Sequence, residues 1–312
     1  MSAPPSRRHL LQLAGAAAGT LWLPRSAWSQ PQRFADNPFA LGVASGSPTH
    51  DSVVLWTRLL QTGLFGPAAL GAAPVTVRWE VADDEGFTRI VRNGQAQALV
   101  ELAHSVHVEV PGLASDRWYF YRFMAGDAVS PVGRTRTFPA PGAIASRLRV
   151  AYASCQRWEH GYFSAWRHMR DDRPDLVLFL GDYIYEYARA DNPVRTPPGG
   201  VVMTLDDYRA RYALHRGEPE LQAMHAACPW LVTWDDHEVE NDYAGLNPGN
   251  RGLPGAEFAA RRAAAYQAYY EHMPLRASAL TRALTGLAGG AELRLYGQVP
   301  FGRLATLYLL DD

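Results

Sequence analysis

A run of five apolar residues, Leu176–Leu180, constrains the fold of this chain most, because it stops at a glycine followed by an acid. The run is too short for a helix and suits a strand that is buried on both faces of its sheet. In open α/β sheets, ligands bind beyond the carboxyl ends of the strands. The carboxylate of Asp182 is therefore predicted to lie at a binding site, where Gly181 lets backbone or ligand come close. Taken alone, such an acid is more often a helix cap in a loop.

Strand and helix patterns alternate through the second half of the chain. A strand pattern, a helix pattern with apolar residues three apart, and the central strand follow one another as a βαβ unit. Such alternation is typical of an α/β domain, which we expect to span residues 144–312. The predicted strands lie at 148–153, 176–180, 230–234 and 304–310, and the predicted helices at 162–170, 204–215, 219–227 and 256–272.

The first half of the chain has a different sequence pattern, in which short predicted strands are separated by turn residues. Apolar and polar residues alternate at 75–81 and again at 104–110, and no helical pattern interrupts about 100 residues. This predicts a small antiparallel β-sandwich over residues 30–143 with a supporting or substrate-shaping role. A leucine six residues before Tyr119 resembles the tyrosine corner of fibronectin type III sandwiches. The prolines and glycine of 139–143 form the predicted linker.

The first 29 residues have the pattern of an export signal. Arg7 and Arg8 form a twin arginine before the apolar run Leu10–Leu23, and Ala27–Ser29 offers small residues for cleavage. The apolar run is short for a bilayer span, and an uncleaved membrane anchor is the alternative. We expect a twin-arginine signal peptide over residues 1–29, recognition by the twin-arginine export machinery, and a periplasmic or secreted protein with no stable membrane span.

Charge, composition and cysteine content narrow the classes of protein to which this chain can belong. Lys plus Arg number 30 against 31 Asp plus Glu, so the net charge of -1 gives no sign of a nucleic-acid-binding patch. With 47% apolar and 11% aromatic residues the chain is not a disordered protein. Cys155 and Cys228 could pair in an exported protein, and the sequence leaves that open. We expect a monomer whose function comes from a local site.

Four predicted strands of one sheet end in polar residues, which predicts a metal site at their common edge. Hard divalent ions take carboxylates, whereas a thiolate beside a phenolate and carboxylates suits a redox-capable transition metal such as iron. Neighbouring carboxylates repel one another unless a cation lies between them. Singly, Cys155 and Tyr185 are more simply explained as core side chains. The polar residues at the strand ends are Cys155, then Asp182 with Tyr185, then Asp235, Asp236 and His237, then Asp311 and Asp312.

Three stretches carry a resemblance to the alkaline phosphatase D (PhoD-like) family of metallophosphatases: Ser154–Gln156, Leu180–Glu186 and Trp234–Tyr243. The second and third are highly specific, because a ten-residue run that mixes Trp, Asp, Asp, His and Glu rarely arises by coincidence. The resemblance implies a metallophosphatase-type α/β sandwich for the second domain. Shorter matches at Leu41–Gly46, Val54–Arg58, Tyr208–Tyr212 and Gln222–His225 extend it over nearly the whole exported chain.

The resemblance also implies a metal centre of iron (Fe³⁺) and calcium (Ca²⁺). In it Asp182 bridges the two metals, and Cys155 and Tyr185 bind iron. Asp236 occupies the position of an Asn or Asp ligand, and Asn241 is a candidate ligand on the calcium side.

His237 and Asp182 are the catalytic residues that the resemblance implies, with His237 stabilising the transferring phosphoryl group. The predicted function is an exported, metal-dependent phosphoesterase that hydrolyses phosphate monoesters, diesters or both with metal-activated water. A phospholipase D-like or teichoic-acid-directed phosphodiesterase is the alternative enzyme. An exported binding module with a structural calcium ion is the alternative outside enzymes, and it would not need Cys155 or His237.

The end of the chain departs from the family pattern. Family members continue further and carry a later Asp-x-His segment with more metal ligands, whereas no such segment follows Tyr243 here. We therefore expect a metallophosphatase domain that is truncated at the C-terminus.

Overall fold

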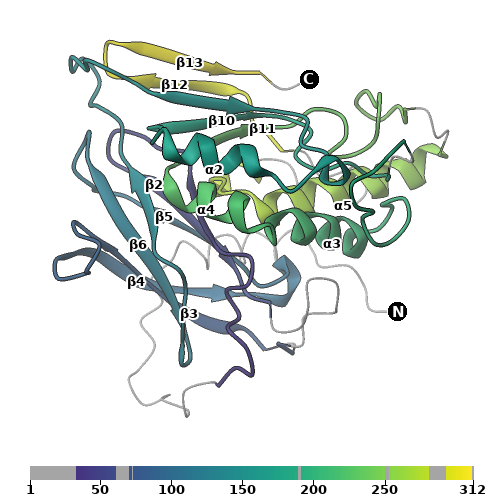
Figure 1. Ribbon diagram of the computed structural model, residues 1–312, viewed down its shortest axis with the longest axis horizontal. Coiled ribbons are helices and arrows are strands. Elements are labelled where there is room, and N and C mark those ends of the chain that lie inside the picture. Colours follow the sequence, from purple (N-terminus) through teal and green to yellow (C-terminus); the bar gives the residue numbers. More distant parts are fainter. Residues whose placement is uncertain are drawn as a thin grey trace.

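A mixed six-stranded sheet lies at the centre of the fold and takes strands from both halves of the chain (Figure 1). The computed structural model describes residues 33–60, 70–71, 73–188, 191–249, 253–280 and 293–310. The expected signal peptide at 1–29 and the acids Asp311 and Asp312 lie outside the described residues, and what was predicted of them stays a prediction. No helix in these ranges is both long and apolar enough to cross a bilayer.

The strand order of the central sheet is β5-β2-β1-β11-β10-β9. Strands β9, β10 and β11 run parallel, as their βαβ pattern requires, and β1 joins them parallel to β11. Position 46 requires glycine, because a Cβ on Gly46 would lie 2.6 Å from the carbonyl oxygen of Pro274. The bounds are β1 Val43–Gly46, β2 Val53–Arg58, β5 Ser105–Val110, β9 Val150–Ala153, β10 Leu176–Leu180 and β11 Trp230–Thr233.

The predicted antiparallel strands of the first half are present, but three of them belong to the central sheet. Strands β1, β2 and β5 continue that sheet, and a second antiparallel sheet of order β4-β3-β6-β7, with β8 on β6, packs across them. The two halves thus share a sheet, and the boundary at residue 143 stays a prediction. The second sheet and its connections comprise β3 Val75–Ala82, β4 Ile90–Ala98, η1 Val100–Leu102, β6 Trp118–Ala125, β7 Ala128–Val129 and β8 Gly133–Arg136.

The core between these two sheets follows the period-two pattern of the sequence. Val75 and Val77 of β3 are buried, while Thr76 and Arg78, which alternate with them, are exposed. The hydroxyl of Tyr119 accepts a hydrogen bond of 2.9 Å from the backbone N–H of Ala114, the contact expected of a tyrosine corner. The fibronectin type III topology itself stays a prediction.

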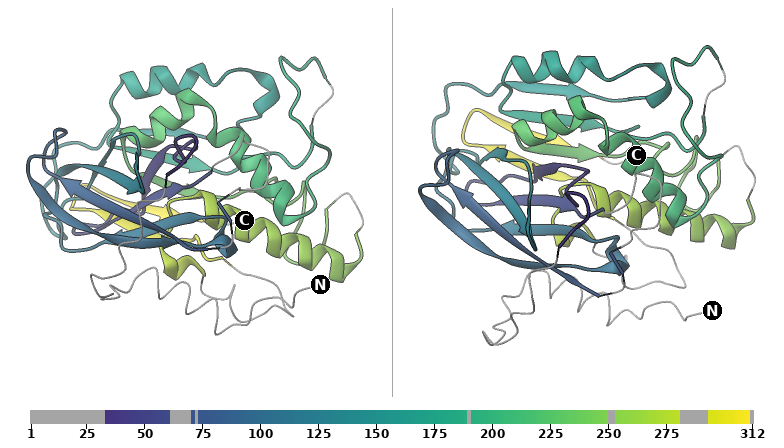
Figure 2. Two further views of the ribbon diagram at one scale, coloured as in Figure 1. Left: turned by 90° about the horizontal axis from the view of Figure 1, so that it is seen from below. Right: turned by 60° about the horizontal axis from the view of Figure 1, so that its bottom comes forward.

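Four helices cover one face of the parallel strands (Figure 2). Phe179 of β10 points to this side, where its ring packs 6.1 Å from Trp166 and 6.0 Å from Trp230. Thr204 caps the helix that follows it, because its side chain accepts a hydrogen bond from the N–H of Asp207. The helices are α2 Ser164–Asp171, α3 Leu205–Arg216, α4 Pro219–Ala227 and α5 Gly255–His272, with short 3₁₀ turns η2 Trp158–His160 and η3 Ala277–Leu280.

The prediction that residues 304–310 form a fourth strand of the central sheet is wrong. Strand β13 (Ala305–Leu309) pairs only with β12 (Gly297–Phe301) in an antiparallel hairpin of its own. The hairpin lies on the face of the sheet opposite the helices, where Phe301 contacts Phe138 at 4.9 Å (Figure 1). An apolar run indicates burial on some surface but does not say which strand it pairs with, and here Tyr308 is 71% exposed.

Candidate metal centre

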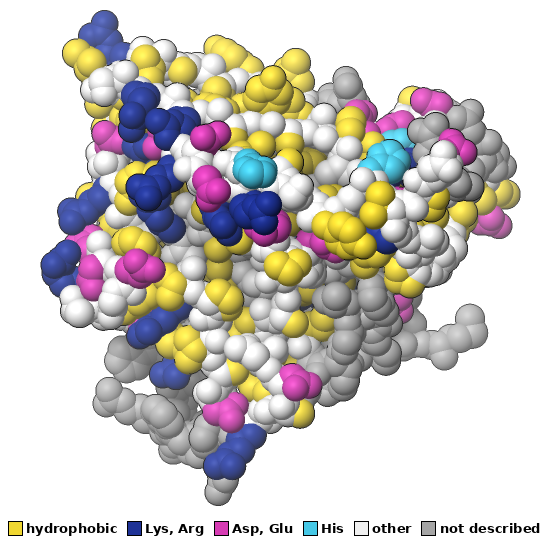
Figure 3. Space-filling view, in the orientation of Figure 1, with side chains coloured by type: hydrophobic (Ala, Val, Ile, Leu, Met, Phe, Trp, Pro, Cys, Tyr) yellow, Lys and Arg dark blue, Asp and Glu magenta, His cyan; other side chains and the backbone are white. Residues whose placement is uncertain are grey.

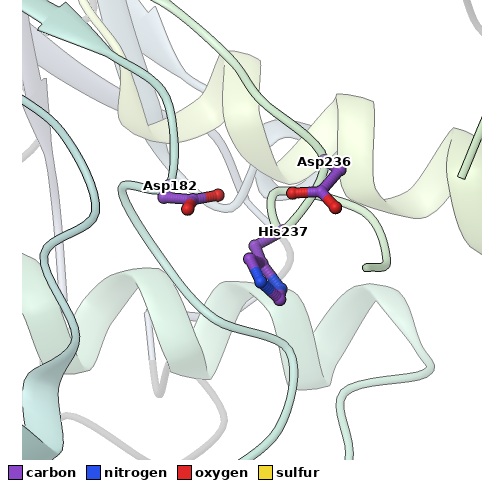
Figure 4. Close-up of side chains that lie close together, drawn as sticks. All are labelled: Asp182, Asp236 and His237. Atoms are coloured by element: carbon purple, nitrogen blue, oxygen red, sulfur yellow. The ribbon is translucent and has the colours of Figure 1, made fainter. Parts of the chain in front are cut away.

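Two carboxylates and an imidazole meet beyond the carboxyl ends of β10 and β11 (Figure 4). Asp182 follows β10, and Asp236 and His237 follow β11. One potential ligand atom of each lies within 4.8 Å of the others. Because β10 and β11 are parallel neighbours, their carboxyl ends reach the same edge of the sheet. The predicted convergence of these two strand ends is therefore confirmed.

The backbone at the strand ends is shaped for close approach. Gly181 has a φ of +93°, and a Cβ at this position would lie 2.4 Å from the backbone nitrogen of Asp235. Asp182 and Cys155 also have positive φ, at +57° and +56°. Non-glycine residues adopt this left-handed region at a cost of order 1–3 kcal/mol, and such residues cluster at functional sites. The N–H of Cys155 donates to the carbonyl oxygen of Gly181 at 3.1 Å, so the turns after β9 and β10 are joined.

Glu238 ties the two loops of the site together. Its fully buried carboxylate accepts hydrogen bonds from the backbone N–H groups of Asp182 (3.1 Å), Tyr183 (2.5 Å) and Asp235 (2.9 Å). Burial raises the pKa of Glu238 to about 8, and the Asp182 carboxylate adds to this, while the three backbone donors act against it. The sequence motif contains this acid, but only the structure shows that it positions Asp182.

The two oxygens of the Asp182 carboxylate differ. Oδ2 accepts a hydrogen bond of 2.9 Å from the hydroxyl of Tyr185. Oδ1 is buried and has no hydrogen-bond partner among the residues that the structure describes. A buried carboxylate oxygen without a donor is costly, and a cation is the partner that carboxylate oxygens otherwise find. The Asp236 carboxylate nearby accepts only one hydrogen bond among the described residues, from the N–H of Asp242 at 2.5 Å. This pair of carboxylates therefore fits a bound cation.

Tyr185 and Cys155 lie close to Asp182, and their roles as metal ligands stay predictions. Burial, and then the charge of Asp182, raise the pKa of Tyr185 well above its ordinary value. Burial together with Asp182 also raises the pKa of the Cys155 thiol. The Tyr185 ring lies 3.7 Å from the guanidinium carbon of Arg157 and 4.3 Å from the imidazole ring of His237. The thiol of Cys155 is exposed and lies outside the group formed by Asp182, Asp236 and His237.

His237 is held by a buried carboxylate that the sequence reasoning did not single out. Its Nδ1 lies 2.7 Å from Oε2 of Glu186, and Glu186 is fully buried. Burial opposes the charge on both groups. The hydrogen bond between them nevertheless raises the pKa of His237 and lowers that of Glu186. With Nδ1 occupied, Nε2 is the nitrogen left for another partner. The sequence signal for this contact was Glu186 itself, the acid that ends the motif Leu180–Glu186.

The remaining predicted residues take other positions. The side-chain amide of Asn241 donates to Asp242 at 2.6 Å, and its backbone N–H donates to Glu186 at 3.0 Å. Asn241 therefore supports the loop after β11 here, and its role as a calcium ligand stays a prediction. Asp235 lies outside the cluster of Asp182, Asp236 and His237. Cys155 and Cys228 are both free thiols, and Cys228 is buried.

Comparisons with known proteins agree with this geometry. The family model "PhoD-like phosphatase" matches residues 150–312, and the model "PhoD-like phosphatase, N-terminal domain" matches residues 25–139. Alkaline phosphatase D of Bacillus subtilis (strain 168) is 48% identical over 317 residues, which is 98% of this chain and 53% of that protein. A solved structure of PhoD gives a TM-score of 0.84 at 50% identity and covers 90% of this chain and 53% of its own. The chain spans about half the length of these relatives.

Proposed function

Because this chain belongs to the PhoD-like phosphatase family, we propose that it is a metal-dependent phosphoesterase whose centre is built around Asp182. The observation that carries the proposal is the buried, unpartnered Oδ1 of Asp182, with Asp236 and His237 beside it. Two carboxylates at this spacing are unfavourable without a cation between them. A metal would remove both the repulsion and the missing partner.

We assign the metal to Asp182, Asp236, Cys155 and Tyr185, with Asn241 as a further candidate. The thiolate and phenolate favour iron and the carboxylates favour calcium, in line with the family resemblance. Because the pKa values of Cys155 and Tyr185 are raised, binding would release their protons. When bound, the metals would neutralise phosphate charge and lower the pKa of a water molecule.

His237 is proposed to act on the substrate phosphate. Glu186 fixes the imidazole so that Nδ1 is engaged and Nε2 can donate a hydrogen bond to a phosphoryl oxygen. The raised pKa of His237 keeps that donor protonated nearer neutral pH. Glu186 is then a positioning residue for His237. Glu238 is a positioning residue for Asp182, because it accepts a hydrogen bond from the backbone N–H of Asp182.

Phosphate monoesters, diesters or both are the proposed substrates, with water as the nucleophile and an alcohol as the leaving group. The similarity to an alkaline phosphatase supports monoesters. A phospholipase D-like or teichoic-acid-directed activity is the alternative for diesters. We further propose export by the twin-arginine route to the periplasm or exterior, and action as a monomer.

Replacement of Asp182 tests the proposal. In the Asp182→Asn variant we expect hydrolysis of both p-nitrophenyl phosphate and bis(p-nitrophenyl) phosphate to fall to near background, together with the bound metal. Asp206→Asn is the matched control, because that side chain is 91% exposed on α3. Full activity of the Asp182 variant would refute the assignment. Calcium alone, without hydrolysis by the unaltered protein, would support the binding module.

A further inference from the structure

Arginine side chains line a cleft at the opposite, amino-terminal edge of the parallel strands. The cleft has a volume of about 910 Å³ and lies where β6 and β8 meet the residues that lead into β9 and β10. Figure 3 shows Lys and Arg side chains gathered at the left of the face seen in Figure 1, with a few acids among them. Every basic residue there is an arginine, because the sequence has no lysine. The five that line the cleft are Arg134, Arg147, Arg149, Arg170 and Arg173.

Acidic residues do not balance these charges. Glu85, Asp171 and Asp175 also line the cleft. Asp175 is already engaged, because it pairs with Arg136 at 2.6 Å and accepts the backbone N–H of Arg149 at 2.8 Å. Asp171 lies 3.9 Å from Arg170, a distance too long for a strong ion pair. The cleft therefore keeps an excess of positive charge although the whole chain has a net charge of -1.

Three of the arginines are available to a ligand. Arg147 and Arg173 are exposed, and neither forms an ion pair within the part of the chain that the structure describes. The guanidinium carbon of Arg134 lies 3.6 Å from the centre of the Trp118 ring, which holds it in place without neutralising it. Burial lowers the pKa of Arg134; the charge of Asp175 acts against this, and the charges of Arg136 and Arg173 add to it. The guanidinium groups of Arg147 and Arg173 are therefore the ones left without an ion pair among the described residues.

We propose that this cleft binds a flexible chain that carries several phosphate groups. Guanidinium groups match phosphate oxygens two by two, and five of them spread over one cleft exceed what a single phosphate can contact. A flat membrane surface cannot follow the concave wall, whereas a chain can. Six residues lie between Asp175 and Asp182, five of them in β10, which places the two roughly 20 Å apart at about 3.3 Å per residue, so one phosphate group cannot occupy both sites. The proposal is independent of the phosphoesterase activity.

A fluorescein-labelled oligomer of propanediol phosphodiesters tests the cleft, because it carries phosphate charge but no base. We expect saturable binding by fluorescence anisotropy to the metal-loaded protein and equally to Asp182→Asn. The double variant Arg147→Gln/Arg173→Gln should bind the oligomer at least about tenfold more weakly than the unaltered protein, since two charge-assisted contacts are lost. Arg78→Gln/Arg303→Gln removes the same charge from exposed sites elsewhere and should bind as the unaltered protein does.

The charge-conserving variant Arg147→Lys/Arg173→Lys separates lost recognition from lost folding. It should keep most of the affinity, and its thermal midpoint should match that of the glutamine variant. Three outcomes would overturn the proposal: no binding of the oligomer, binding lost in Asp182→Asn but kept in the glutamine variant, or binding only to phosphatidylglycerol vesicles. The second would place the oligomer at the metal centre, and the third would assign the arginines to a membrane surface.

Discussion

The two edges of the parallel strands differ in charge and in how their polar groups are paired. At the carboxyl edge, Asp182, Asp236 and His237 lie within 4.8 Å of one another, and a buried oxygen of Asp182 has no partner. At the amino edge, five arginines line an open cleft. At the carboxyl edge, the buried carboxylates of Glu186 and Glu238 hold His237 and the backbone of Asp182 in place. The amino edge offers exposed charge, which suits recognition of an anionic chain.

Of the proposed variants, Asp182→Asn should lower activity most, because it removes a charged carboxylate from the carboxyl edge of the parallel strands. With the proposed metal centre, loss of this negatively charged ligand should lower kcat/KM by about a thousandfold or more, because bound metal would supply most of the charge stabilisation. Metal analysis beside the kinetics checks the cause. Retention of both metals with unchanged kcat/KM would mean that the unpartnered oxygen has no part in metal binding.

Gly181→Ala tests whether the carboxyl edge depends on close backbone approach. A Cβ there meets the backbone nitrogen of Asp235 at 2.4 Å and stands at a φ of +93°, so we expect about 2–4 kcal/mol of lost stability and weaker metal binding. Gly199→Ala is the matched control. It has a φ of +82° with nothing within 4 Å, so only the conformational cost of about 1 kcal/mol should remain. Urea unfolding measures both, and equal losses would argue against the steric explanation.

Glu186→Gln tests how His237 is held. The amide cannot support a charged imidazole, so the pKa of His237 should fall and kcat should drop about tenfold to a hundredfold, with KM little changed. Because His237 acts in its protonated form, the alkaline limb of the activity profile should move to lower pH in the variant. An unchanged profile would show that Glu186 serves the fold alone.

His107→Gln tests the pH dependence of stability away from both edges of the parallel strands, because His107 lies in β5. Its Nε2 is 2.9 Å and 3.0 Å from the carbonyl oxygens of Tyr270 and Met273, and burial lowers its pKa to about 4. The unfolded state therefore takes up a proton first, and stability is full above the ordinary pKa of about 6.5 and declines as the pH falls toward about 4.

The expected difference between the unaltered protein and His107→Gln is small. The loss of unfolding free energy between neutral pH and about pH 5.5 should be about 1 kcal/mol larger in the unaltered protein than in the variant. Urea unfolding at the two pH values measures it. Parallel pH profiles would show that His107 does not contribute to acid sensitivity.

Local pattern was sufficient for the elements and for part of the site. The short apolar strand that is followed by Gly181 and Asp182, the four helices, and the polar residues after β9, β10 and β11 all follow from local pattern, because period and strand length depend on neighbours in sequence. The convergence of Asp182 with His237 follows from the same rules, since parallel strands share an edge.

Pairing partners were decided only by the tertiary structure. The addition of β1 to β11 and the contacts of Glu186 and Glu238 join residues far apart in sequence. The β12–β13 hairpin is local, but its place on the sheet depends on the long-range contact between Phe301 and Phe138. Nothing local distinguishes a buried acid that holds a histidine from one that holds a backbone loop. The arginines of the cleft are likewise scattered from 134 to 173, and only the packing of the two halves brings their charges together. The sequence by itself therefore determined the elements and the chemistry at their ends, while long-range packing determined which groups support that chemistry.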